Sequence, residues 1–178
     1  IYALRAMRWQ PAIRTMAPYH DHPSYIAALK CSLEEHLSTL GWEPDTILAS
    51  FHGLPKKYFE AGDPYYCHCA KTTRLLREAM EFDDDKLQMT FQSRFGPAAW
   101  LEPYTDDVLS DLAAKGRKQV VVLTPGFSAD CLETMDEIEN EQFWNLKHFR
   151  ELLDINEIPE EEVKYFRVSR RPWSHGDI

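Results

Sequence analysis

The chain has 178 residues, of which 44% are hydrophobic and 28% charged, and its net charge is −9. This composition is typical of a folded globular protein and excludes a disordered chain. The negative charge argues against a nucleic-acid partner, because binding DNA or RNA needs a surplus of Lys and Arg. No stretch approaches the roughly 20 apolar residues of a transmembrane segment, and the cysteines are too few for a disulfide scaffold. We expect a cytoplasmic protein, with peripheral association to a membrane left open.

Hydrophobic periodicity divides the chain into four units of strand and helix. The strands are expected at residues 11–17, 46–51, 87–92 and 119–124, and the helices at 24–40, 71–80, 106–114 and from 130 onward. In the first helix Ile26, Leu29, Leu33 and Leu37 recur at intervals of three and four, which makes one buried face. Because strands and helices alternate, the sheet should be parallel. We predict a doubly wound α/β domain with a mainly parallel sheet of about four strands and helices on both faces.

The same pattern predicts a domain at residues 11–143. The chain opens without an initiator Met, so we expect it to begin inside a longer protein. Further on, residues 156–162 are acidic and residues 167–172 are basic, and neither resembles another strand-helix unit. Residues 144–178 are therefore interpreted as a divergent or truncated tail.

Three loops that follow predicted strands carry unusual residues. They are residues 52–55 (HGLP), 93–97 (SRFGP) and 125–130 (PGFSAD). Ligands of an open parallel sheet bind outside the carboxyl ends of its strands, so we expect these loops to converge on one site. His52 can exchange a proton near neutral pH or ligate a metal. A histidine that only satisfies a loop hydrogen bond remains the alternative.

A row of carboxylates follows the third loop. Glu133, Glu137 and Glu141 recur every four residues, which places them along one side of a helix. Like charges at this spacing repel each other, and carboxylates are acceptable ligands for Fe2+. A path for a divalent cation would explain the row, and a solvated acidic face remains the alternative. The segment 67–69 (CHC) supplies only two thiolates and is not interpreted as a metal site.

Four motifs at these loops resemble ferrochelatase. They are residues 50–55 (SFHGLP), 62–65 (GDPY), 92–97 (QSRFGP, followed by Trp100) and 125–134 (PGFSADCLET), in the order of that family. The family has two similar α/β domains that clamp a porphyrin in the cleft between them. The resemblance implies that this chain is the second domain, whose missing partner is the amino-terminal α/β domain. It implies also that residues 1–10 are the end of that preceding domain. It further implies a lyase-class metal chelatase that inserts Fe2+ into protoporphyrin IX, releases two protons and forms protohaem, the last step of haem biosynthesis.

The resemblance also implies roles for single residues. His52 and Glu133 would be the catalytic pair and ligands of the metal, with His52 the preferred acceptor of the pyrrole protons. Glu137 and Glu141 would be further metal ligands. The expected porphyrin contacts are Trp100, Phe127, Asp130 and Arg94.

Some members of the family hold a [2Fe-2S] cluster through cysteines near the carboxyl terminus. This chain has no cysteine beyond Cys131, so we expect no cluster and no other prosthetic group, with Fe2+ as a substrate only. Two alternatives stay open. One is a related chelatase for another divalent metal and tetrapyrrole, and the other is a non-catalytic fragment that binds porphyrin or metal because half the cleft is missing.

Overall fold

The computed structural model describes residues 5–9, 11–128, 131, 133–134 and 164–168. The elements in chain order are α2 (Pro23–Thr39), β1 (Thr46–His52), α3 (Lys56–Glu60), α4 (Tyr65–Met80), β2 (Leu87–Gln92), α5 (Thr105–Ala114), β3 (Gln119–Leu123) and β4 (Lys164–Val168). Most of the predicted tail and most of the predicted last helix lie outside the described residues.

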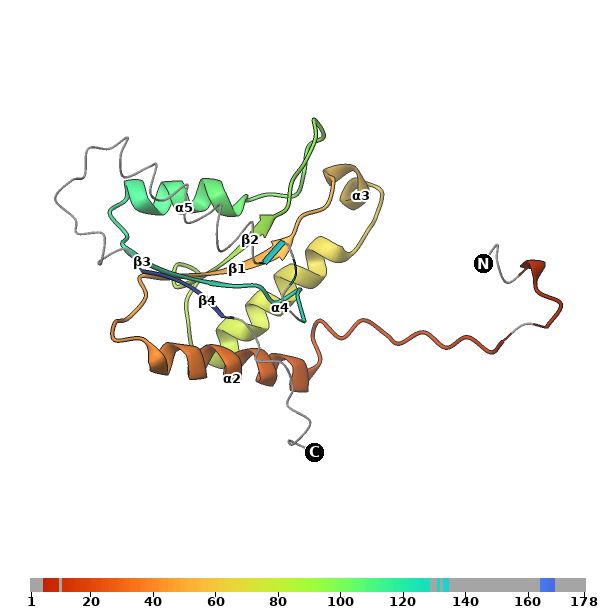
Figure 1. Ribbon diagram of the computed structural model, residues 1–178, viewed down its shortest axis with the longest axis horizontal. Coiled ribbons are helices and arrows are strands. Elements are labelled where there is room, and N and C mark those ends of the chain that lie inside the picture. The colour runs from red at the N-terminus through yellow and green to blue at the C-terminus, as the bar shows by residue number, and fades with distance from the viewer. Residues whose placement is uncertain (1–4, 10, 129–130, 132, 135–163, 169–178) are drawn as a thin grey trace.

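The sheet is parallel and has the strand order β2-β1-β3-β4. The chain runs from β1 to β2 through α4, and then returns through α5 to the opposite side of β1, where β3 pairs. Figure 1 shows α2 and α4 on one face of the sheet and α5 on the other. The doubly wound α/β prediction is therefore confirmed.

Alternation along β1 explains how the two faces are filled. Successive side chains of a strand point to opposite faces. Accordingly Ile47, Ala49 and Phe51 pack with residues of α2 and α4, whereas Leu48 packs with residues of α5. The side chains on both faces of the sheet are buried at β1, so this strand shows the nearly continuous apolar run that is typical of a central parallel strand.

Local signals set the helix boundaries. Pro23 is the first residue of α2, and the His22 side chain caps it by accepting a hydrogen bond from the Ser24 N–H. The helix α4 begins at Tyr65, earlier than predicted, because the Asp63 carboxylate accepts a hydrogen bond from the Tyr65 N–H just after Pro64. The segment 67–69 therefore lies on a helix. The short helix α3 was not predicted from the sequence.

Three of the four predicted strands are present, and the strand expected at residues 11–17 is wrong. These residues form no strand, and all of them are exposed. A strand needs a partner edge, and among the described residues the free side of β3 pairs with β4 instead. β4 lies in the segment that was interpreted as a tail, where no strand was expected.

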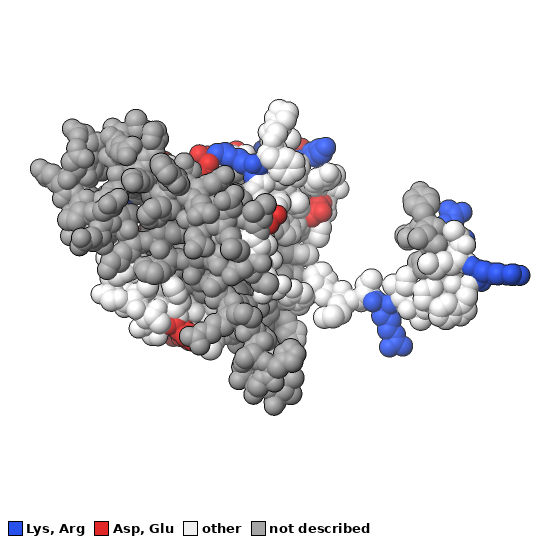
Figure 2. Space-filling view, in the orientation of Figure 1, with Lys and Arg blue, Asp and Glu red and all other residues white. Residues whose placement is uncertain are grey.

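Residues 11–17, with residues 5–9 beyond them, form an arm that leaves the body of the molecule (Figure 1). Large apolar side chains on it are exposed, Trp9 by 79% and Met16 by 86%. Figure 2 shows basic side chains on this arm, which the sequence identifies as arginines, although the chain as a whole is acidic. The arm thus offers apolar and basic groups together.

Candidate active site

The carboxyl ends of β1 and β3 form the point at which the doubly wound sheet changes direction. β1 and β3 pair as neighbours, with Ala49 opposite Leu123, although the chain visits β2 between them. Ligands of such sheets bind in the crevice at this point. His52 is the last residue of β1, and residues 124–128 follow β3, so two of the three predicted loops meet here.

His52 lies at the rim, half-buried, with its ring held by its own neighbour. Its Nδ1 lies 2.6 Å from the Gly53 carbonyl oxygen. A carbonyl oxygen can only accept a hydrogen bond, so Nδ1 carries the proton and, in the neutral ring, Nε2 keeps its lone pair. The Phe127 ring lies 6.3 Å from the imidazole, tilted by 49°. The geometry therefore presents Nε2 as the atom that can accept a proton or bind a metal.

Glu133 lies in a turn of π-helical geometry together with Thr134. Such turns are frequent at functional sites. The pKa of the Glu133 carboxyl is lowered, first by a hydrogen bond from its own backbone N–H, next by one from the Cys131 side chain, and further by attraction to His52. Phe127 lies beside His52, and the Glu133 carbonyl oxygen accepts a hydrogen bond from Gln92, the register partner of His52, so these residues lie near the carboxyl end of β1.

Thr134 anchors this turn. It is 1% exposed, and its Oγ1 accepts a hydrogen bond from the Cys131 N–H at 3.0 Å. The Thr134 N–H donates to the Cys131 carbonyl oxygen at 3.1 Å. The backbone on both sides of the Glu133 side chain is consequently held from within the turn.

Trp100 lies behind the turn at Gly53 and is 5% exposed. Its Nε1 donates to the Phe95 carbonyl oxygen at 3.0 Å, and the two rings lie 4.9 Å apart. A Cβ at Gly53 would lie 3.2 Å from the Trp100 ring. In this structure Trp100 therefore supports the His52 turn, and contact with a porphyrin stays a prediction.

The Arg94 side chain interacts with other side chains of this chain. It forms ion pairs with Asp106 and Asp107, in the first turn of α5, and its guanidinium lies 4.0 Å from the centre of the Tyr104 ring. It does not join His52 and Glu133 in a common cluster. Asp130, Glu137 and Glu141 lie outside the described residues, so their predicted roles stay predictions.

A buried polar group beneath the site was missed by the sequence analysis. Gln92 is 4% exposed; its Oε1 accepts a hydrogen bond from Ser50 Oγ, and its Nε2 donates to the Glu133 carbonyl oxygen, both at 2.8 Å. Ser50 Oγ also lies 2.8 Å from Thr105 Oγ1, which donates to Thr90 Oγ1 at 2.9 Å. Ser50 and Gln92 are polar residues near the carboxyl ends of β1 and β2, but nothing in the sequence marks them as buried partners.

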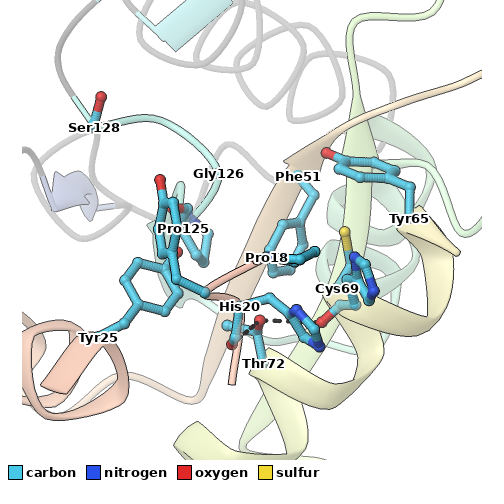
Figure 3. A pocket seen from close by; sticks show the side chains of 12 residues that line it. Pro18, His20, Tyr25, Phe51, Tyr65, Cys69, Thr72, Pro125, Gly126 and Ser128 are labelled. Carbon is cyan, nitrogen blue, oxygen red and sulfur yellow. Dashed lines mark hydrogen bonds between the residues drawn. The ribbon is translucent and has the colours of Figure 1, made fainter. Parts of the chain in front are cut away.

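A cavity of about 290 Å³ opens on the other face of the same sheet edge, beside α2 and α4. Figure 3 shows Phe51 of β1, Tyr65 and Cys69 of α4, and Pro125 around it. Because successive strand residues face opposite sides, Phe51 lines this cavity and His52 faces away from it. Burial raises the pKa of the Cys69 thiol to about 12, so this sulfur stays protonated.

No metal cluster is formed within the part of the chain that the structure describes: no group of three or more His, Cys, Asp or Glu side chains there could hold an ion. Among the same residues, no helix is long and apolar enough to cross a membrane.

Comparison with known proteins identifies the family of this chain. The family model described as ferrochelatase matches residues 1–155. The chain is 53% identical over 174 residues to the ferrochelatase of Rhizobium meliloti, covering 95% of this chain and 51% of that protein. It is 56% identical over 138 residues to the ferrochelatase of Agrobacterium fabrum and 55% identical over 139 residues to that of Brucella ovis, in each case covering 78% of this chain and 40% of the relative. The chain thus spans about half the length of the relatives it matches or somewhat less, and it belongs to the ferrochelatase family.

Proposed function

We propose that this chain is the metal-inserting part of a ferrochelatase. Together with the remainder of such an enzyme, it inserts Fe2+ into protoporphyrin IX with release of two protons and forms protohaem, which is lyase-class chemistry. Family membership supports this proposal. The observation that carries it is the place of Glu133: its carbonyl oxygen accepts a hydrogen bond from Gln92, the register partner of His52, beside the switch point of the sheet.

His52 acts as the base in this proposal. A free porphyrin must lose its two pyrrole protons before its four nitrogens can bind the metal. The Nδ1 of His52 is committed to the Gly53 carbonyl, so Nε2 is the atom that receives a proton. A positioned general base of this kind contributes about 100- to 10,000-fold to a rate.

Glu133 binds the metal and replaces part of its water in this proposal. Its carboxyl is ionised at neutral pH, as the ordinary pKa of a glutamate already ensures, and an ionised carboxylate is an oxygen ligand that can replace water on Fe2+. Glu137 and Glu141 would extend this path, as their spacing suggests. Phe127, beside the imidazole, would pack against the flat face of the porphyrin.

The partner of this chain is proposed to be the other half of the enzyme. Relatives are about twice as long, and the arm before α2 exposes large apolar side chains such as Trp9. Exposed apolar patches of soluble proteins mark contact surfaces. The short length also supports a second candidate, a fragment that binds porphyrin without turnover.

One assay separates the two candidates. The chain is incubated anaerobically with Fe2+ and protoporphyrin, alone and together with the part of the Rhizobium meliloti ferrochelatase that it does not cover, while porphyrin absorbance is followed. Metal insertion that is lost in His52→Ala and in Glu133→Gln supports the enzyme. Tight porphyrin binding without insertion under both conditions supports the binding fragment. Faster insertion of another divalent metal than of Fe2+ in competition would favour a related chelatase.

Two further properties are proposed from the sequence. The enzyme works in the cytoplasm, and it carries no [2Fe-2S] cluster, because the cysteines of the chain end at Cys131. The visible absorption of the purified protein tests the second point. Bands of a cluster that disappear on reduction would contradict it.

A further inference from the structure

Gln92 touches the backbone on both sides of the candidate active site. It is the last residue of β2, and its Cα is the register partner of His52. On one side its carbonyl oxygen accepts a hydrogen bond from the Gly53 N–H at 2.7 Å. On the other side its Nε2 donates to the Glu133 carbonyl oxygen at 2.8 Å. One residue therefore connects the turn after His52 to the turn that carries Glu133.

The orientation of the Gln92 amide follows from the chemistry of its partners. The Glu133 carbonyl oxygen can only accept, so the amide nitrogen must face it. The amide oxygen then faces Ser50 Oγ, which donates to it. Both ends of the amide are satisfied at once. A rotation of the amide would leave buried polar groups unpaired, which is unfavourable in a dry interior.

The surroundings of Gln92 hold its side chain in this position. Ser50 and Thr90 are fully buried and Thr105 is 1% exposed, and their hydroxyls follow one another at 2.8 and 2.9 Å. They come from β1, β2 and the start of α5, so the support is part of the rigid sheet and its helix. Gln92 is therefore the last of a series of buried polar side chains that contact one another.

The link to the imidazole runs through the backbone of Gly53. Its N–H is bound to Gln92, and its carbonyl oxygen accepts the Nδ1–H of His52. A Cβ at Gly53 would lie 2.8 Å from the Gln92 carbonyl oxygen, so only glycine permits this approach. Gln92 therefore holds the His52 ring in place through the Gly53 backbone, and it holds Glu133 in place through the Glu133 carbonyl oxygen.

We infer that Gln92 is a positioning residue that sets the separation of His52 and Glu133 and thus the efficiency of metal insertion. This inference rests on the function proposed above. A base and a metal-binding carboxylate that act on one porphyrin must keep their spacing, and an error of about 1 Å in such groups can lower a rate about 100-fold. Gln92 acts through the backbone of both groups and touches neither substrate.

Two substitutions test this role in the complete enzyme. Gln92→Met keeps the volume and removes the donor, and it should lower kcat roughly 10- to 100-fold while the KM for porphyrin stays within about twofold. Gln92→Asn keeps the amide but is one methylene shorter, so its nitrogen cannot reach the Glu133 carbonyl oxygen while its oxygen accepts from Ser50. Its kcat should fall by a similar factor, again with the KM for porphyrin within about twofold of wild type.

The matched control is Gln88→Met in the same strand. The Gln88 Nε2 also donates to a backbone carbonyl, that of Asp85 at 3.1 Å, but at the far end of β2. This variant should keep the wild-type kcat. Thermal unfolding of each variant separates a loss of folding from a loss of position.

The outcomes are distinct. A folded Gln92→Met or Gln92→Asn variant with wild-type kcat overturns the positioning role while the proposed function stands. Wild-type protein that inserts no metal overturns the proposed function, and the inference with it. If Gln92→Met does not fold, the kcat of Gln92→Asn, which keeps a polar amide at this position, decides.

Discussion

Substitution of Gly53 by alanine gives a quantitative test of the packing behind His52. The new Cβ would lie 2.8 Å from the Gln92 carbonyl oxygen and 3.2 Å from Cε3 of the Trp100 ring. The first contact is with backbone and cannot be relieved by rotating a side chain, so the turn or β2 must move. That movement also lengthens the hydrogen bond from the Gly53 N–H to Gln92, now 2.7 Å.

The size of the effect follows from these two contacts. Overpacking of a well-packed interior costs about 1–3 kcal/mol, and a weakened buried hydrogen bond adds about 0.5–1.5 kcal/mol. We therefore expect Gly53→Ala to lower the free energy of unfolding by about 2–4 kcal/mol. The His52 ring, which is bound to the Gly53 carbonyl, moves with the turn, so metal insertion should also fall by about 10-fold or more.

Urea unfolding followed by tryptophan fluorescence measures the first effect. Gly41→Ala is the matched control, because nothing lies within 4 Å of a Cβ at Gly41. Its free energy of unfolding should stay within about 1 kcal/mol of wild type. If Gly53→Ala were as stable and as active as Gly41→Ala, the close approach of Gly53 to Gln92 would have no mechanical importance and the reasoning would be refuted.

Three further predictions concern other parts of the molecule. Burial, and next the charge of the neighbouring His68 imidazole, lowers the pKa of His20 in the folded chain. The unfolded chain therefore binds this proton more readily, and the free energy of unfolding should fall as the pH drops below about 6.5. The variant His20→Gln should lose less stability than wild type between pH 7.5 and pH 5.5, as measured by unfolding curves. Cys69, whose pKa is raised to about 12, should react with a thiol reagent far more slowly than the exposed Cys31 and Cys67, and equal rates would contradict its burial. Arg94→Gln should lower the free energy of unfolding by at most about 1 kcal/mol, because its ion pairs are exposed; a raised KM for porphyrin would identify it as a substrate contact.

Much of the fold follows from local patterns in the sequence. The three-four spacing of α2 and the apolar runs of β1, β2 and β3 need no distant information to be recognised. The segment 11–17 has a strand-like pattern but forms none, because strand pairing depends on a free edge far away in the sequence. The early start of α4 depends on a single capping contact at Asp63.

Part of the candidate site could likewise be predicted from the sequence, and part of it could not. The rule for parallel sheets places His52 at the ligand edge, and the resemblance to ferrochelatase names Glu133 and Phe127. In the structure the Phe127 ring lies 6.3 Å from the His52 ring, and Glu133 is bound through its carbonyl oxygen to Gln92, the register partner of His52. Gln92 could not be identified, because its acceptor at residue 133 is a backbone carbonyl in a distant turn. A hydrogen bond to the backbone of a distant residue does not require any particular side chain there, so it produces no recognisable pattern in the sequence.

The central claim is that the imidazole of His52 and the carboxylate of Glu133 face one metal-sized space. Crystals of the complete enzyme soaked in Zn2+, with anomalous scattering recorded at the zinc edge, test it most directly. We expect a peak about 2.0–2.2 Å from both His52 Nε2 and a Glu133 carboxylate oxygen, typical of zinc bound to such ligands. A strong peak elsewhere with none between these two residues would contradict the claim.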